Sequence, residues 1–191
     1  MSTIQIRLPD GNTLAVPAGS TVLDVARTIG AGLARAALAG RIDGRLADLR
    51  TPLEADAAIE IVTGKDPQAG EVIRHSAEHV MADTVKRLFP NAQVDVGRTD
   101  HSEKFQYDFL MEHPFTPEDL ESIEKEMWKI LAEKSEFVRE VISREEAVAF
   151  FAARGEKLKV SRIADIPEDQ EITIFRHGEF TDLCRGPHVQ R

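Results

Sequence analysis

Residues 71–89 read EVIRHSAEHVMADTVKRLF, and this stretch organises the rest of the chain. Its apolar side chains recur at the spacing of one helix face, which predicts an amphipathic helix with that face turned to the core. The apolar set comprises Ile73, Ala77, Val80, Met81, Val85 and Leu88. His75 and His79 are four residues apart, so they lie one turn from each other on nearly the opposite side. We expect these two histidines to line a groove that another part of the chain completes.

The second stretch that carries chemistry is CRGPH at residues 184–188. Gly-Pro cannot continue a helix, so Cys184 and His188 are expected on a turn that aims both side chains at one point. Together with His75 and His79 they form a His₃Cys set suited to tetrahedral zinc. Without metal, the same groups form a polar pocket in which imidazoles orient or deprotonate a water. Spacing alone leaves both alternatives open.

HSAEH also matches the inverted His-x-x-Glu-His pattern of one class of zinc proteases. That function needs a further carboxylate ligand, and residues 65–191 contain 26 acids that do not single one out. Short patterns also match by chance, so a peptidase is the weakest alternative. Cys184 as a nucleophile is also a weak hypothesis, because no activating base can be located for it.

Composition restricts the classes of protein. With 42% apolar and 30% charged residues in 191, the chain is typical of a folded globular protein. No stretch reaches the roughly 18 to 20 apolar residues of a membrane span, and no secretory leader is evident, so we expect a cytoplasmic protein without a membrane partner. The net charge of −9 argues against binding nucleic acid by bulk electrostatics, so any such contact must be local. The single cysteine excludes an intramolecular disulfide.

Residues 1–64 predict a small β-grasp, ubiquitin-like domain. Alternating segments at 4–8 and 13–16 flank the turn sequence PDGN, which indicates a β-hairpin. A helix capped by Thr21 and ended by Gly30 follows, and short strands come after it. This part contains no histidine, cysteine or phosphate-binding glycine loop, so we expect a binding or spacer module.

The pattern of residues 65–191 predicts a second domain of the α+β class, in which helices pack on a mostly antiparallel sheet. Helices are expected to begin at the N-caps Thr116 and Ser143. Leu120, Ile123, Met127, Ile130 and Leu131 are the expected buried stripe of the first of these helices. Strands are expected at 92–96, 104–110, 137–142, 157–163 and 171–177.

Four segments together resemble the N-terminal region of bacterial threonyl-tRNA synthetases: HSAEHVMADTVKRLFP, YDF, PFTPEDLESIEKEM and TDLCRGPH. Residues 1–64 resemble the TGS domain and residues 65–191 the editing domain, so the resemblance covers essentially the whole chain. The His-x-x-x-His and Cys-x-x-x-His layout is shared with editing domains of alanyl-tRNA synthetases, which is the alternative within the superfamily. The TGS-like domain in front and the PFTPEDL segment favour the threonyl enzymes.

The resemblance implies proofreading, in which the ester joining a wrongly attached serine to tRNA(Thr) is hydrolysed. The expected partner is therefore the 3′ end of tRNA(Thr) carrying serine. The catalytic residues that it implies are His75, His79, Lys159, Cys184 and His188. Tyr107 is expected to contact the substrate, Asp182 to bind the seryl amino group, and Lys159 to position the attacking water, with Lys157 as the alternative lysine. Bacterial members of the family work without metal here, so no cofactor is expected; zinc, if bound, would be held by His75, His79, Cys184 and His188.

Two features depart from the family pattern. The segment GRTDHSEKFQYDF at residues 97–109 is longer than its counterpart, and Gln106 stands where the family has an aromatic residue. The chain also stops just after His188, where family members continue into a class II core and an anticodon-binding domain. ATP, magnesium, a catalytic zinc and homodimer formation are expected to belong to those absent domains. We therefore expect a truncated editing domain that cannot charge tRNA; a noncatalytic tRNA-docking or regulatory module is the alternative of a different class.

Overall fold

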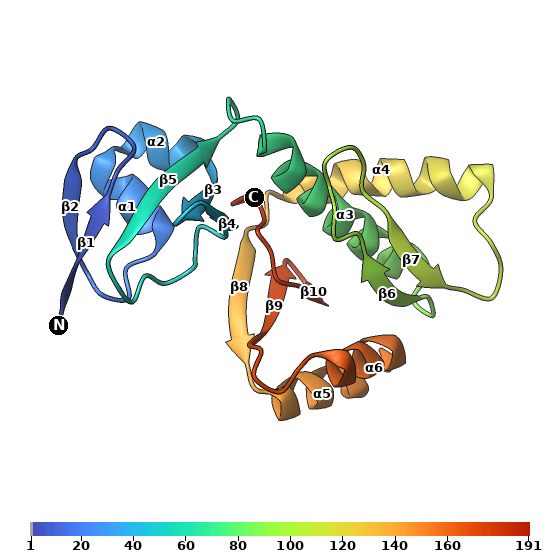
Figure 1. Ribbon diagram of the computed structural model, residues 1–191. Helices are drawn as coiled ribbons and strands as arrows, with labels where there is room; N and C mark the ends of the chain where they lie inside the picture. Colours follow the sequence, from blue (N-terminus) through green and yellow to red (C-terminus); the bar gives the residue numbers. More distant parts are fainter. Residues whose placement is uncertain (1) are drawn as a thin grey trace. The chain divides into compact units, whose positions relative to one another are not determined.

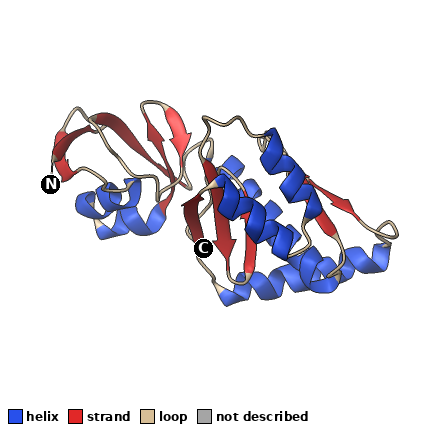
Figure 2. Ribbon diagram, turned by 90° about the horizontal axis from the view of Figure 1, so that it is seen from below, coloured by secondary structure: helices blue, strands red, loops and turns tan. Residues whose placement is uncertain are grey.

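The computed structural model describes residues 2–191 as two compact units. The first unit comprises the residues up to Ile73 together with Gly186–Gln190, and the second comprises Arg74–Arg185 and Arg191. Figure 1 follows the chain through its labelled elements, and Figure 2 separates helices from strands by colour. The domain boundary expected after residue 64 stays a prediction, because these units are a division by spatial contact.

The first unit is built on a five-stranded sheet of order β2-β1-β5-β3-β4. Its elements are β1 (Thr3–Arg7), β2 (Thr13–Pro17), α1 (Val22–Ile29), α2 (Ala31–Ala36), β3 (Ala37–Ile42), β4 (Arg45–Ala47) and β5 (Ala57–Thr63). β1 pairs with β5 in parallel and every other pair is antiparallel. Val22, Val25 and Ala26 of α1 pack with Ile6 and Ile59 of the sheet. The predicted β-grasp arrangement is thus confirmed, while α2 was not predicted.

The second unit combines helices with two antiparallel sheets of order β10-β9-β8 and β6-β7. Its elements are α3 (Ala69–Leu88, which begins in the first unit), β6 (Gln93–Gly97), β7 (Tyr107–Leu110), α4 (Pro117–Glu133), β8 (Phe137–Ile142), α5 (Arg144–Ala153), α6 (Lys157–Asp165), β9 (Ile172–His177) and β10 (Phe180–Leu183). α5 follows β8 directly and lies beside α6 (Figure 1). The predicted α+β class with mostly antiparallel strands is confirmed.

The strand expected at residues 157–163 is wrong, because this segment forms helix α6. Its buried side chains are Lys159 and Ile163, four residues apart, which is the spacing of one helix face. Ile163 packs against Ala147 and Phe151 of α5. The alternation of lysine with apolar residues in KLKV imitates a strand over only four residues.

Two predicted buried faces also need correction. In α3, Ile73 is 50% exposed and Leu88 37% exposed, whereas His79 is only 2% exposed. The middle of α3 is therefore largely covered by protein, and His79 is enclosed rather than exposed to solvent. In α4, Ile123 and Ile130 are buried as expected, but Leu120 and Leu131 lie on the exposed side.

Within residues 2–191, the helices are all too short or too polar to cross a membrane.

Candidate active site

The buried middle of α3 carries the paired histidines. The ring centroids of His75 and His79 are 5.3 Å apart, with an edge-on angle of 78°. His79 also meets the rings of Tyr107 and Phe180 edge-on, at 6.3 Å from each. Burial lowers the pKa of His79 to about 4, and the attraction of Asp182 only partly offsets this effect. His79 is therefore a neutral imidazole near pH 7.

Cys184 reaches this helix from the end of β10. Its backbone N–H donates to the carbonyl of Thr173 at 3.1 Å, and the Thr173 hydroxyl donates back to the carbonyl of Cys184. These two bonds fix the start of the turn that follows β10. Cys184 Sγ lies 3.2 Å from Nε2 of His75. One ligand atom from each of His75, His79 and Cys184 lies within 4.8 Å of the others, so three of the four predicted zinc donors are brought together in this unit.

A buried charged network lies next to the histidines. Lys159 of α6 forms an ion pair with Asp182 of β10, with 2.5 Å between Nζ and Oδ1, and donates to the hydroxyl of Tyr107 at 3.0 Å. The Tyr107 hydroxyl in turn donates to Oδ2 of Asp182. All three side chains are buried. Burial favours the neutral forms of ionisable groups. Two buried groups keep their charges only when they contact each other and are hydrogen-bonded, as they are here.

The charge of Asp182 affects the pKa values in this network. Burial opposes its ionisation, but the Lys159 ammonium and the nearby His79 hold the pKa of Asp182 below its usual value. Burial, and then the Asp182 charge, raise the pKa of Tyr107 well above its usual value. The network is thus an ionised carboxylate, an ammonium and a neutral phenol near pH 7. The Leu183 backbone N–H donates to the same carboxylate at 2.7 Å.

One pocket of about 270 Å³ gathers most of the predicted site residues. Its walls include His75, His79, Tyr107, Lys159 and Cys184. Further lining comes from the arginines Arg98, Arg162 and Arg185 and from the carboxylates Glu78, Asp95 and Glu171. Residues from α3, β6, β7, α6 and the end of β10 thus converge on a space the size of a small ligand.

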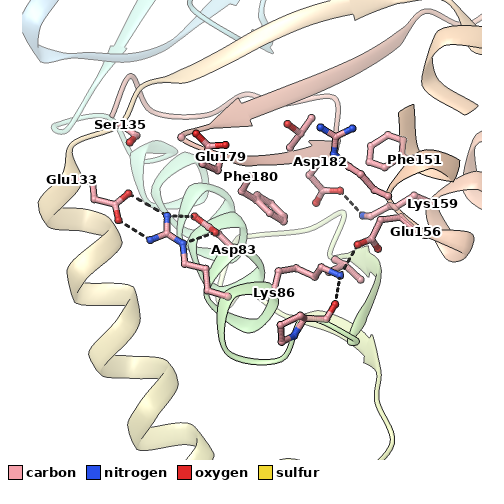
Figure 3. A pocket seen from close by; sticks show the side chains of 16 residues that line it. Asp83, Lys86, Glu133, Ser135, Phe151, Glu156, Lys159, Glu179, Phe180 and Asp182 are labelled. Carbon is pink, nitrogen blue, oxygen red and sulfur yellow. Dashed lines mark hydrogen bonds and ion pairs between the residues drawn. The ribbon is translucent and has the colours of Figure 1, made fainter. Parts of the chain in front are cut away.

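Asp182 lies behind this pocket and lines a second, larger cavity of about 840 Å³. Figure 3 shows this cavity, with Asp182 joined to Lys159 and Lys86 joined to Glu156. Lys159 lines both cavities. The Lys159–Asp182 pair therefore forms part of the partition between them.

Two predicted residues are not among those that line the smaller pocket. His188 belongs to the first unit, where its buried backbone N–H donates to Oδ2 of Asp48 at 3.1 Å, and its role in the site stays a prediction. Lys157, the alternative lysine, is exposed, and its backbone N–H donates to Oε1 of Gln93. Lys159 is thus the lysine that lines the pocket.

Glu78 and His101 were not predicted as site residues. Glu78 is 1% exposed, and its Oε2 lies 3.1 Å from Nε2 of His101 and accepts the Gln106 backbone N–H at 3.0 Å. The His101 ring stacks on His75 at 4.4 Å. The one trace of this arrangement in the sequence is the glycine at position 97. In the structure, a Cβ at Gly97 would lie 1.7 Å from Oε1 of Glu78. Only glycine lets the carboxylate approach the strand so closely.

Comparison with known proteins shows what this chain is similar to. Residues 4–63 match the TGS domain family. The chain is 52% identical to a threonine–tRNA ligase of Cupriavidus necator over 186 residues, which cover 97% of this chain and 29% of that protein. It is 50% identical to that of Pelobacter propionicus (99% and 29% covered) and 47% identical to that of Citrifermentans bemidjiense (100% and 30% covered). The chain thus spans about 29% of the length of the curated relatives that it matches.

Proposed function

The chain belongs with the N-terminal part of the bacterial threonyl-tRNA synthetases, and from this premise we propose that it is their editing region, which hydrolyses seryl-tRNA(Thr). The observation that carries the proposal is the single pocket in which His75, His79, Tyr107, Lys159 and Cys184 meet. Hydrolysis of an ester needs polar groups that hold the carbonyl and orient a water. This pocket supplies such groups as the two imidazoles of its histidines and the ammonium of its lysine.

The size of the pocket fits a selective role. A synthetic site built for threonine rejects serine weakly, because one missing methyl group is worth only about 1–3 kcal/mol. A second site that accepts the smaller amino acid removes the error. A space of about 270 Å³ with buried, hydrogen-bonded walls is small enough to discriminate by shape.

In the reaction that we propose, a water oxygen bonds to the ester carbonyl carbon and the bond from that carbon to the ribose oxygen breaks. The ribose oxygen takes a proton, which gives free serine and tRNA. Lys159 positions the water, and the imidazoles of His75 and His79, the latter neutral, hold it by hydrogen bonds. Asp182 attracts the seryl ammonium group; because its oxygens already accept from Lys159, Tyr107 and Leu183, this role requires those bonds to rearrange.

Positive charge at the pocket supports a nucleic-acid substrate despite the acidic composition. Arg162 donates two hydrogen bonds, of 2.7 and 2.9 Å, to the carboxylate of Asp95, and Arg185 donates to Gln170 at 2.7 Å. Both arginines are exposed and line the pocket, as does the half-buried Arg98. Guanidinium groups are suited to phosphate, so we propose that these three contact the 3′ end of tRNA(Thr).

The test is a deacylation assay with seryl-tRNA(Thr) and threonyl-tRNA(Thr), run with this chain and with a version extended at its C-terminus. Selective release of serine supports the proposal. If neither protein acts on either substrate, the proposal fails and a noncatalytic tRNA-docking module takes its place. Hydrolysis of seryl-tRNA(Ala) in preference to seryl-tRNA(Thr) assigns the chain to the alanyl type instead.

Two matched variants locate the activity. Tyr107→Phe removes one hydroxyl from the Lys159–Asp182 network, and we expect a slower deacylation by about tenfold or more. Lys157→Met changes an exposed lysine on the same helix as Lys159 and is expected to act as the unaltered chain does. The roles of His188, a cytoplasmic location and dimer formation through further domains stay predictions.

A further inference from the structure

We propose that His75, Glu78 and His101 form a binding site for a divalent transition-metal ion, which shares only His75 with the His₃Cys set that the sequence suggested. One ligand atom of each of the three lies within 4.8 Å of the other two. They combine two imidazoles with one carboxylate, a donor set that zinc and related ions take in proteins.

The three donors come from two parts of the chain, the helix α3 and the segment after β6. His75 and Glu78 are three residues apart on α3, so their side chains lie on the same face one turn from each other. His101 comes from the segment between β6 and β7 and stacks on His75, with 4.4 Å between the ring centroids. Two donors on one helix and a third from a loop can together hold an ion with three protein ligands.

The loop that carries His101 is fastened in place. Arg74, which precedes His75 on α3, donates from its guanidinium to the carbonyls of His101 and Ser102. The Ser102 backbone N–H donates to Oδ1 of Asp100 at 2.8 Å. Because these bonds exist without an ion, little ordering of the backbone is needed when one binds.

The Glu78 carboxylate is also held in place by its neighbours. Its Oε2 lies 3.1 Å from Nε2 of His101 and accepts the Gln106 backbone N–H at 3.0 Å, while its Oε1 is the atom that faces Gly97. The carboxylate is almost fully buried, so a cation beside it compensates the cost of its charge. The ion takes the place of the direct contact between Nε2 of His101 and Oε2 of Glu78.

Binding requires the stacked rings of His75 and His101 to turn, because an ion lies in the plane of each imidazole that holds it. Two nitrogens on a tetrahedral zinc are roughly 3.3 Å apart, because each lies about 2.0 Å from the metal. The donors here are separated by up to 4.8 Å, so rotation of the imidazoles must bring them closer. Both rings are side chains that turn about their own bonds, so the backbone of α3 need not move.

The experiment is a titration of the chelator-treated chain with Co²⁺, followed by the visible absorption of the bound ion. We expect saturable binding of one ion, without the near-ultraviolet band of a cobalt–thiolate bond. His101→Gln should weaken binding more than about a hundredfold, since even outer partners of metal ligands contribute 10–100-fold. Glu78→Gln, which keeps the shape and removes the charge, should also weaken it.

Two control variants distinguish this site from the cysteine set and from adventitious binding at a surface histidine. Cys184→Ser and His113→Gln, the latter at an exposed histidine, should bind Co²⁺ as the unaltered chain does. Binding that is lost in Cys184→Ser and retained in His101→Gln would assign the ion to the cysteine set and overturn the proposal, as would the lack of saturable binding. Circular dichroism and urea unfolding check that each variant is folded. No aminoacyl-tRNA is involved, so the result is independent of the proposed function.

Discussion

At the scale of single residues, the buried ion pair of Lys159 and Asp182 has the largest consequence for stability. Lys159→Met leaves the Asp182 carboxylate buried without its cation, and we expect the free energy of unfolding to fall by about 3–5 kcal/mol. Urea unfolding measures this loss. Lys159→Met combined with Asp182→Asn should recover part of it, and Lys157→Met should cost little. An equal, small loss in all three proteins would contradict the pairing.

His177 should make the stability of the second unit depend on pH. It is 4% exposed, stacks on Phe137 at 4.3 Å, and its Nδ1 has no hydrogen-bond partner among residues 2–191. Burial lowers the pKa of His177 below the ordinary 6.5, so the unfolded chain binds a proton first as the pH falls. Stability is full above about pH 6.5 and is lost toward the lower folded-state pKa, by at most about 1.4 kcal/mol per pH unit.

The measurement compares urea unfolding of the unaltered chain and of His177→Gln at about pH 8 and about pH 5.5. The variant should lose less stability between the two pH values. If both proteins lose the same amount, His177 is not the group that titrates.

The sequence predicted which side chains come together better than it predicted their surroundings. His75, His79 and Cys184 could be paired because each has few structural uses in such a pattern. The burial of His79 could not be predicted, since it depends on Tyr107, Phe137 and Phe180, which come from distant segments. Glu78 was visible in the HSAEH motif, but its contacts with His101 require the path of the loop.

At the scale of elements, α4 offers a test of how its start is fixed. The Thr116 hydroxyl accepts from the Asp119 backbone N–H at 3.2 Å, and the Asp119 carboxylate accepts the Thr116 backbone N–H at 2.8 Å. Thr116→Ala should lower the free energy of unfolding by about 1 kcal/mol, because a backbone N–H loses its partner. Urea unfolding measures it. Thr116→Ser keeps the hydroxyl and should be nearly neutral, and a cost equal to that of alanine would exclude the cap as the cause.

Elements with strong local signals were predictable, and those decided by packing were not. The capped starts of α1, α4 and α5 and the β1–β2 hairpin follow from neighbouring residues. α6 lacks a side-chain cap, and its helical face is recognisable only once Lys159 and Ile163 are known to be buried. α2 is six residues long, and its N-cap is Gly30, which is also the residue that ends α1.

At the scale of the whole molecule, net charge sets a limit on the RNA binding that we propose. With a net charge of −9, attraction to phosphates is confined to a few arginines. We expect this chain to bind uncharged tRNA(Thr) no more tightly than about 10⁻⁶ M at physiological salt, and more weakly as salt rises. Filter binding at several salt concentrations measures this. Arg185→Gln should reduce the salt slope, whereas Arg27→Gln in the first unit should not; a tight complex that ignores salt would contradict this.

The first unit is discontinuous in the chain, because Gly186–Gln190 pack with it although more than a hundred residues of the second unit intervene. The Gln190 side chain donates to the carbonyls of Ala34 and Ala37, and Val189 packs with Ala39, Val62 and Val72. A ribosome makes these residues only after it has made residues 74–185 of the second unit. During synthesis, the sheet of the first unit therefore waits with one edge of its core unfilled until the second unit has left the exit tunnel, which ties the order of folding to the order of translation.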